Sequence, residues 1–219
     1  KPIFYSQKEF TQYFPKSGWV EHNPDEIWRT TVKTLKDVIQ KARRLKGKIL
    51  SIGITNQRET TVLWDKNTGI PVHNAIVWQD RRTVEICNNL HERKLDKAIQ
   101  EITGLVIDPY FSATKIKWIL DNNSDARRLI KEKNLLFGTI DTWLLWNLTE
   151  KASHLTDITN ASRTMLFDLN KEEWSLDLLK ILDIPKEILP KVVENTFNFG
   201  NTKLFGSSVP ICGMAGDQQ

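Results

Sequence analysis

Two adjacent charged residues, Arg58 and Glu59, lie just beyond an apolar stretch that has the composition of a buried strand. The stretch covers residues 48–55 and continues into the polar run 56–61. Charged side chains at the end of a buried strand are a common way to build a site in α/β folds. Because successive side chains of a strand point to opposite faces, the two residues can meet one ligand only where the strand ends or bulges. The alternative is a surface ion pair, which contributes little to stability.

A single carboxylate, Asp217, follows a second apolar run, which ends in the glycine-flanked residues Gly213 to Gly216. Glycines let a backbone and a ligand approach each other closely. Asp217 is therefore a candidate general base or metal ligand. An N-cap role for a following helix explains an aspartate at this position equally well, and both interpretations stay open.

Trp78 is the third candidate, at the end of the strand predicted for residues 75–78. An indole at a strand end offers a flat wall for the carbon atoms of a small ligand. Packing into the core is the alternative for this side chain, and the two are equally compatible with the sequence.

Several other kinds of site are excluded by motifs that the sequence lacks. There is no G-x-x-x-x-G-K-[ST] loop, no G-x-G-x-x-G and no G-x-S-x-G elbow. The four histidines are scattered, without the spacing of a zinc site. Cys87 and Cys212 lie far apart and predict two reduced thiols in a cytoplasmic protein. The longest uncharged run near the C-terminus, residues 204–216, contains three glycines and a proline and is too short for a membrane span.

The composition is that of an ordinary globular protein, with 40% hydrophobic and 26% charged residues among 219. A chain of this size can bury about 70% of its unfolded surface without disulfides or metals. The net charge of +4 is mild, and the basic clusters 41–48 and 127–133 fall at the ends of helical patterns, where the helix dipole favours cations. Aromatic residues are not interleaved with these clusters, so the sequence predicts no nucleic-acid partner.

The elements that must position the candidates begin with a helix from Pro24 to Arg44, capped by Asn23. Strands are predicted at residues 48–55, 60–64, 75–78 and 209–214, with a turn at 67–69 that makes the middle pair a hairpin or meander. Further helices are predicted at residues 83–95, 96–102, 112–121 with Ser112 as the cap, 125–132, 141–147 and 175–182. Residues 155–167 are expected to be loop and strand. This order of elements predicts one mixed α/β domain over residues 1–219.

Several runs of residues resemble the FGGY family of carbohydrate kinases, and some of them resemble its glycerol kinases in particular. The matching runs are residues 17–22, 54–61, 74–82, 103–112, 157–165 and 216–219. Residues 110–122 are similar throughout to the family's first signature, with Ser112, Lys115, Trp118 and Asp121 in the expected places. The resemblance covers nearly the whole chain.

The resemblance implies an actin-like, ribonuclease H-like α/β fold, with a mixed sheet flanked by helices, as the N-terminal of two domains. It implies ATP- and Mg²⁺-dependent phosphorylation of glycerol to sn-glycerol 3-phosphate by a cytoplasmic homodimer or homotetramer. By match of motif, the substrate would contact Arg58, Glu59, Trp78, Tyr110, Asp217 and Gln218. Arg58, Glu59, Tyr110 and Asp217 would hold hydroxyls, and Trp78 would pack on the carbons. Asp217 would be the general base and would hold the metal through water.

The sequence departs from the family pattern in three places. The family's first phosphate-binding hairpin, of the type Asp-Gln-Gly-Thr-Thr-Ser, is expected before Lys1, and the C-terminal nucleotide domain is expected after Gln219. We therefore expect residues 1–219 alone to be incomplete for turnover. The loop 202–208 is shorter than in bacterial relatives and lacks their Gly-Thr-Arg, so we expect no inhibition by fructose 1,6-bisphosphate. The alternatives are another FGGY polyol or sugar kinase, or a non-catalytic polyol-binding relative.

Overall fold

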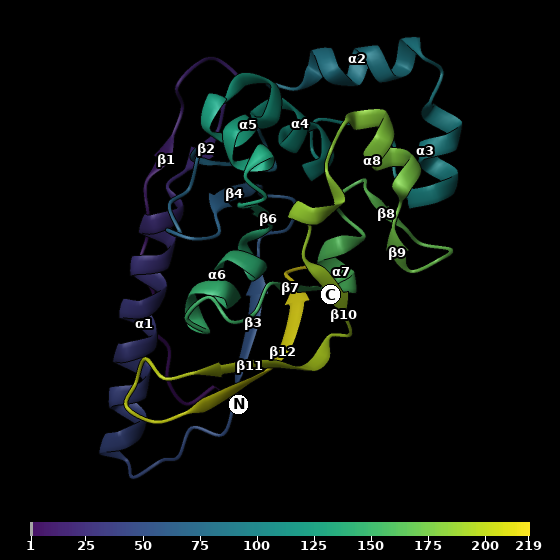
Figure 1. Cartoon of the computed structure of the whole chain (residues 1–219). Helices are drawn as coiled ribbons and strands as arrows, with labels where there is room; N and C mark the ends of the chain where they lie inside the picture. Colours follow the sequence, from purple (N-terminus) through teal and green to yellow (C-terminus); the bar gives the residue numbers. More distant parts are fainter. Residues whose placement is uncertain (1) are drawn as a thin grey trace.

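Two parallel strands form the centre of the molecule in the computed structural model, which describes residues 2–219. They are β3 (Ile52–Asn56) and β12 (Val209–Gly216), and Gly216 lies opposite Asn56 at the end of the ladder (Figure 1). The strand β11 (Thr196–Thr202) pairs antiparallel with the other edge of β12. Because β3 and β12 are parallel, their carboxyl ends deliver the residues that follow them to the same edge of the sheet.

The remaining strands form small ladders around this centre. The antiparallel ladders are β4 (Val62–Asp65) with β6 (Leu135–Gly138), β8 (Phe167–Asp168) with β9 (Glu173–Trp174), and β2 (Glu21–His22) between β1 (Gln12–Tyr13) and β5 (Ala75–Ile76). The strands β7 (Leu155–Asp157) and β10 (Lys191–Val193) pair in parallel.

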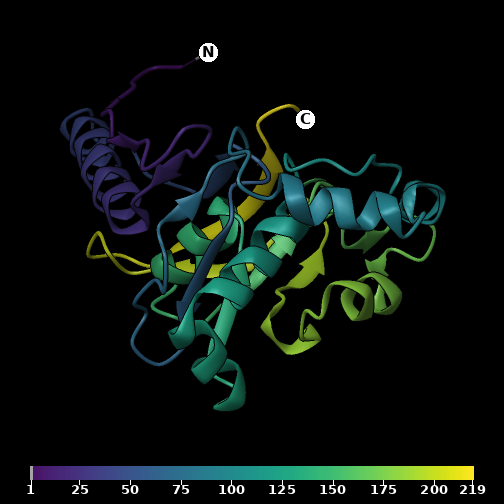
Figure 2. The ribbon, with the colours of Figure 1, turned by 90° about the horizontal axis from the view of Figure 1, so that it is seen from above.

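Helices flank these strands on both sides (Figure 2). They are α1 (Pro24–Arg44), α2 (Val84–Glu92), α3 (Asp96–Thr103), α4 (Ser112–Asn122), α5 (Ser124–Lys131), α6 (Ile140–Leu148), α7 (Ile158–Ala161), α8 (Leu176–Leu182) and the 3₁₀ turn η1 (Lys186–Ile188). The long helix α1 covers one side of the central strands, and α2, α3 and α8 lie on the other (Figures 1 and 2). The mixed α/β architecture predicted from the order of elements is confirmed. Within residues 2–219, none of these helices is both long enough and apolar enough to cross a membrane.

The core next to the central strands is built on helix α6, whose residues are apolar almost all the way round and nearly all buried. Its Trp143 packs edge-on against Trp64 of β4, with 5.2 Å between the ring centroids. Ile211 and Met214 of β12 belong to the same apolar cluster. A second cluster surrounds Ile116 and Ile119 of α4 and the buried leucines of α8, which are Leu178, Leu179 and Leu182. A helix that is hydrophobic all round must be buried, which explains the position of α6 in the core. The packing of these two clusters holds the central strands, and therefore the positions of their carboxyl ends.

The helix predicted from Pro24 to Arg44 is confirmed at both ends, with the Asn23 side chain accepting from the amides of Asp25 and Glu26. The strand expected at 48–55 begins only at Ile52. Residues 67–69 do form a turn, in which the amide of Gly69 donates to the Asp65 carbonyl at 2.8 Å. The hairpin expectation is only partly confirmed, because β4 makes its ladder with β6, and the returning segment is met at two isolated bridges, Trp64–Pro71 within β4 and Thr61–Ile76 just before it.

Two local predictions are wrong. Ser112 does not cap α4, because the N-cap residue is Phe111 and the Ser112 hydroxyl donates to the carbonyl of Glu59 instead. Residues 155–167 contain the short helix α7 in addition to the expected strand and loop. Here the side chain of Asp157 caps the helix by accepting from the amide of Thr159.

Candidate active site

The turn after β3 places Arg58 and Glu59 differently from consecutive strand residues. The strand ends at Asn56, and Glu59 has a left-handed backbone with φ of +62°. This conformation costs a residue other than glycine about 1 kcal/mol or more. The strand therefore ends before Arg58 and Glu59, which is the condition under which both side chains can reach the same ligand. Both side chains are buried, and their charged groups contact other partners, so the interpretation as a surface ion pair is wrong.

Glu59 pairs with Arg163, which follows helix α7. The Arg163 Nε donates to Glu59 Oε1 at 2.8 Å, and Glu59 is only 2% exposed. The Arg163 guanidinium also lies over the rings of Phe111 and Tyr110, at 5.0 and 5.8 Å from their centroids. Burial raises the pKa of the Glu59 carboxyl, and the positive charges of Arg163, Arg58 and Lys115 oppose this shift. Glu59 is thus an acceptor held in a fixed orientation.

Arg58 reaches across to the residues that follow β12. Its Nε lies 3.5 Å from Asp217 Oδ1, and its Nη1 donates to Gln219 Oε1 at 3.2 Å. Among the residues that the structure describes, the buried Nε of Arg58 has no hydrogen-bond partner of normal geometry. The Asp217 side chain is 45% exposed, and its amide donates to the Asn56 carbonyl at 3.0 Å. A guanidinium and a half-open carboxylate therefore stand side by side at the ends of β3 and β12.

A polar network lies under these two strand ends. The Asn56 side-chain amide donates to Asp141 at 3.1 Å and to Asn160 at 2.9 Å. Asp141 is fully buried, and burial raises the pKa of its carboxyl to about 6. On the other side, the Thr159 hydroxyl accepts from the Gly216 amide at 2.9 Å. The network fixes the backbone that carries Asp217 from below, since buried polar groups with partners hold one arrangement.

Trp78 and Tyr110 form an aromatic pair, with 5.3 Å between ring centroids and planes tilted by 56°. Both residues are half-buried, so neither is simply part of the core. Burial and the nearby charge of Glu59 raise the pKa of the Tyr110 phenol, which therefore keeps its proton at neutral pH. The pair offers an apolar wall with one hydroxyl, a suitable contact for a small molecule with carbons and hydroxyl groups.

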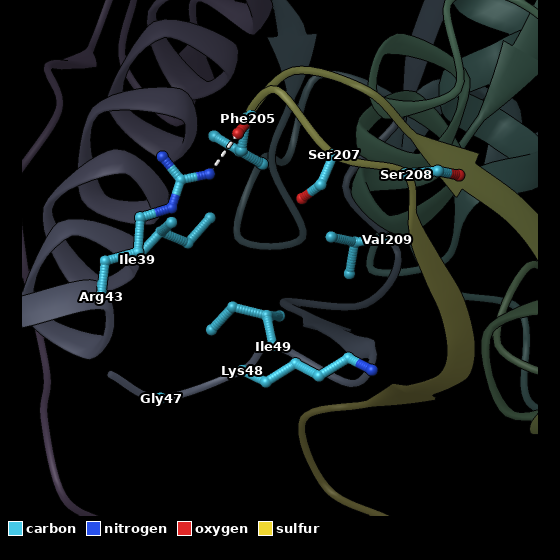
Figure 3. Close-up of a pocket in the computed structure, with 9 residues that line it drawn as sticks. All are labelled: Ile39, Arg43, Gly47, Lys48, Ile49, Phe205, Ser207, Ser208 and Val209. Carbon is cyan, nitrogen blue, oxygen red and sulfur yellow. Dashed lines mark hydrogen bonds between the residues drawn. The ribbon is translucent and has the colours of Figure 1, made fainter. Parts of the chain in front are cut away.

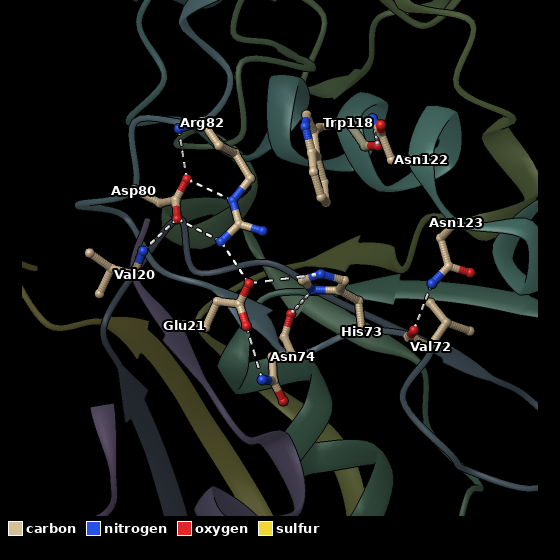
Figure 4. A network of polar contacts seen from close by, with 10 residues as sticks. All are labelled: Val20, Glu21, Val72, His73, Asn74, Asp80, Arg82, Trp118, Asn122 and Asn123. Atoms are coloured by element: carbon tan, nitrogen blue, oxygen red, sulfur yellow. Dashed lines mark hydrogen bonds and ion pairs between the residues drawn. The ribbon is translucent and has the colours of Figure 1, made fainter. Parts of the chain in front are cut away.

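A buried ionic cluster supports the segment that carries Trp78 (Figure 4). The Arg82 side chain is fully buried, and its Nη2 lies 2.8 Å from both Asp80 Oδ2 and Glu21 Oε1. Its guanidinium carbon lies 3.8 Å from the ring centroid of Trp19 and 4.8 Å from that of Trp118, and the two rings stand nearly perpendicular to each other. The Asp80 amide donates to the Val77 carbonyl at 3.0 Å, closing the turn around Trp78.

The structure thus places five of the six predicted site residues in two groups of contacts. Arg58 and Asp217 meet at the strand ends, and Glu59, Tyr110 and Trp78 are connected through Arg163 and the aromatic pair. Gln218 is exposed next to Asp217, and its side chain makes no hydrogen bond within residues 2–219. Arg163 and Lys115 were not predicted as members of the site. Both lie in runs of residues that resemble the family. A charged residue among apolar and small neighbours could have identified each of them as a candidate for the site.

A divalent cation would find one solvent-accessible carboxylate in this cluster, Asp217, because Glu59 is buried and pairs with Arg163. Within residues 2–219, no group of three His, Cys, Asp or Glu side chains is placed to hold a metal. Asp217 is the half-open carboxylate at the site, which fits Mg²⁺ because this ion keeps several waters and takes one or two protein carboxylates together with substrate phosphates.

A separate hollow of about 290 Å³ lies between the end of α1 and the loop that joins β11 to β12 (Figure 3). Arg43 and Lys48 line it together with Phe205 and Ser207, and the Arg43 guanidinium donates to the Phe205 carbonyl. None of the predicted site residues lines this hollow. The basic cluster 41–48 lies at the C-terminal end of α1, as its pattern predicts. One of its residues, Arg43, holds the loop between β11 and β12 by donating to the Phe205 carbonyl.

Comparisons with known proteins show which family this chain resembles. The model of the N-terminal domain of the FGGY family of carbohydrate kinases matches residues 2–219. The chain is 57% identical to a glycerol kinase of Clostridium botulinum and 55% identical to glycerol kinase 1 of Clostridium tetani, over 99% of this chain. It spans 44% of the length of each of these relatives.

A solved structure is also similar over the full chain. The crystal structure of Plasmodium falciparum glycerol kinase with ADP has a TM-score of 0.94 and 37% sequence identity, and the match covers 100% of this chain and 44% of that one. The expected actin-like, ribonuclease H-like α/β fold is thereby confirmed. The chain belongs to the FGGY family of carbohydrate kinases.

Proposed function

We propose that residues 1–219 are the N-terminal, glycerol-binding domain of a kinase that transfers the γ-phosphoryl group of ATP to glycerol, giving sn-glycerol 3-phosphate. The observation that carries the proposal is the contact at the ends of β3 and β12, where Arg58 Nε lies 3.5 Å from Asp217 Oδ1. The relatives named glycerol kinase at 55–57% identity support the choice of glycerol.

The residues around this contact match the needs of a small triol. Arg58 supplies donors, Glu59 supplies an acceptor held by Arg163, and Tyr110 supplies a hydroxyl. Trp78 provides the surface for the carbon chain. A site that offers paired groups to each hydroxyl strongly rejects analogues that lack one, because its buried polar groups are then left unpaired. We assign Gln218 to the edge of this site, next to Asp217.

Asp217 is proposed as the general base. Phosphoryl transfer passes through a loose transition state, so the protein mainly positions the groups and accepts a proton from the attacking hydroxyl. The carboxylate is half-open and lies beside the Arg58 guanidinium, and the backbone that carries it is held by the hydrogen bond from the Asp217 amide to the Asn56 carbonyl. A Mg²⁺ ion brought in with ATP would neutralise developing charge on the phosphates, and Asp217 would hold it through water.

The nucleotide contacts are proposed to come from outside residues 1–219. The chain spans 44% of the curated relatives, which agrees with one domain of two, and a first phosphate-binding hairpin and a C-terminal nucleotide domain would complete the enzyme. We further propose a cytoplasmic enzyme that assembles as a homodimer or homotetramer.

The test is glycerol-dependent release of ADP from MgATP by the full-length protein that contains this chain. We expect Asp217→Asn to lower the rate by several orders of magnitude, the scale of a missing catalytic group. Asp177→Asn, at an exposed aspartate of α8, is the matched control and should keep the wild-type rate.

A panel of polyols and sugars separates the alternatives. Turnover of another polyol in place of glycerol would identify a different FGGY kinase. Binding of a polyol without any ADP release would favour a non-catalytic relative, and either result would overturn the proposal.

A further inference from the structure

Lys115 is a fully buried lysine on helix α4, although lysine is almost never buried without a partner. Its Nζ donates to two backbone carbonyls, those of Tyr110 and of Glu59, the latter at 3.4 Å. Burial lowers the pKa of its ammonium group to about 7, and the charges of Glu59, Asp80 and Asp108 oppose this shift. Keeping such a group inside the protein is costly, which calls for a reason.

The two carbonyls that Lys115 joins belong to residues placed at the substrate. Glu59 and Tyr110 come from different parts of the chain, one after β3 and one before α4. Since Lys115 is 0% exposed and donates to both backbones, it does not face the substrate itself. Its effect on a ligand passes through the positions of these two residues.

The Glu59 carbonyl also receives two hydroxyl donors, from Ser112 at 3.0 Å and from Thr61 at 3.1 Å. Glu59 itself has a left-handed backbone, at φ of +62°. Sparsely populated conformations persist only where the surroundings over-determine them. Three converging donors on one carbonyl meet this requirement and hold the turn in place.

We infer that Lys115, together with Ser112, is a positioning residue that fixes Glu59 relative to Tyr110 and thereby sets which pattern of hydroxyl groups the site accepts. This inference rests on the proposed function, because it concerns the recognition of glycerol. Neither residue takes part in the phosphoryl transfer. Ser112 is as fully buried as Lys115, so neither side chain is placed to contact the substrate directly.

The test compares the kcat/KM of the full-length enzyme for glycerol with that for propane-1,2-diol, which lacks one hydroxyl. The ratio of the two constants does not depend on the fraction of active protein, so partial unfolding does not change it. In Lys115→Met we expect the ratio to fall about tenfold or more. The loss should come mainly from a higher KM for glycerol, while the KM for ATP stays near the wild-type value.

Lys117→Met is the matched control on the same helix. Lys117 is partly exposed and pairs with Asp121 at 2.6 Å, and its ammonium group makes no hydrogen bond to Glu59 or Tyr110, so the ratio should stay at the wild-type value. An unchanged ratio in Lys115→Met, with both constants lowered in parallel, would show a merely structural role and overturn the inference.

If Lys115→Met does not fold, a second variant, Ser112→Ala, tests the same inference. Ser112→Ala removes one donor to the same carbonyl with little change in volume, and we expect the ratio to fall several-fold. An unchanged ratio in this variant overturns the inference as well. Failure of the proposed function gives a different result, because the wild-type enzyme itself would then turn over neither compound.

Discussion

The side chain of Arg58 lies against the backbone of Gly216, so close that a methyl group on Gly216 would stand 2.3 Å from Arg58 Cδ and 2.6 Å from Cγ. Atoms that are not bonded do not approach this closely. The absence of a side chain at the end of β12 is therefore what lets Arg58 cross the strand end and reach Asp217. Glycine serves here for the close approach of another side chain of the same chain, whereas the sequence pattern before Asp217 predicted the close approach of a ligand.

Gly216→Ala should displace Arg58 and weaken the contact with glycerol that we propose for it. We expect the KM for glycerol to rise about tenfold or more, the scale of a lost charge-assisted hydrogen bond, with a smaller change in the KM for ATP. Steady-state kinetics of the full-length enzyme measure both constants. Gly213→Ala on the same strand is the control, since its added methyl would meet only the Asn195 carbonyl oxygen at 3.9 Å. Equal effects of the two substitutions would contradict the role assigned to the Gly216 position.

Arg163→Met should make glycerol binding more sensitive to acid. Burial already raises the pKa of Glu59, and removal of Arg163 takes away the largest opposing influence, so the pKa rises further. As the pH falls through this value, Glu59 gains a proton and no longer offers two acceptor oxygens. The KM for glycerol should therefore increase toward low pH, and in the variant this increase should begin at a higher pH.

The measurement is the KM for glycerol across the pH range in which both enzymes stay folded. At neutral pH we expect Arg163→Met to raise the KM about tenfold or more. Arg128→Met, which removes an exposed arginine of α5 paired with Asp125 and Glu132, should follow the wild-type profile. A profile of Arg163→Met with the wild-type pH dependence would show that Arg163 does not govern Glu59.

Arg82→Met should destabilise the fold by about 3–5 kcal/mol, because it leaves Asp80 and Glu21 as buried carboxylates without their cation. Arg82→Lys restores the charge but not the planar group that lies against the rings of Trp19 and Trp118, so it should recover only part of the loss. Urea unfolding gives the free energies. The neighbouring Arg81→Met is the control and should cost less than about 1 kcal/mol, since Arg81 is exposed and pairs with Asp108 near the surface.

The sequence was sufficient to predict the elements whose signals are local. Asn23 and Pro24 mark the start of α1, and the apolar runs mark β3 and β12, so the strand ends that carry Arg58 and Asp217 could be located. From the sequence we could say only that the strand must end or bulge near Glu59 if Arg58 and Glu59 are to meet one ligand. The sequence did not show that it does. The chain turns there at a left-handed residue, and a glutamate gives no signal for that backbone.

The partners of the site residues could not be predicted in the same way. Glu59 pairs with a residue 104 positions later, and Lys115 reaches a carbonyl 56 positions earlier. Such contacts depend on how α4 and α7 pack against the sheet, which periodicity does not encode. The error at Ser112 has the same origin, because a serine at a helix start is compatible with capping or with a tertiary hydrogen bond, and the packing decides between them.

The fully buried Asp141 and the partly buried His154 should have opposite effects on the stability of the fold between about pH 4 and pH 6. Burial raises the pKa of Asp141 from 3.8 to about 6, so the folded state binds more protons than the unfolded chain in this range. The stability that Asp141 contributes is present at low pH and is lost as the pH rises. Burial lowers the pKa of His154 from 6.5 to about 4, so the stability tied to its neutral form is lost as the pH falls.

Asp141→Asn removes one of these opposing contributions. We therefore expect the free energy of unfolding of the variant to rise more steeply with pH than that of the wild type, by up to about 3 kcal/mol across the range, since each pKa unit corresponds to about 1.4 kcal/mol. Urea unfolding at several pH values between about 4 and 6.5 measures this difference in slope. Asp177→Asn, on the exposed side of α8, should keep the wild-type slope. Parallel curves for Asp141→Asn and the wild type would mean that Asp141 binds no extra proton in the folded state, and that its carboxylate is ionised among its threonine donors.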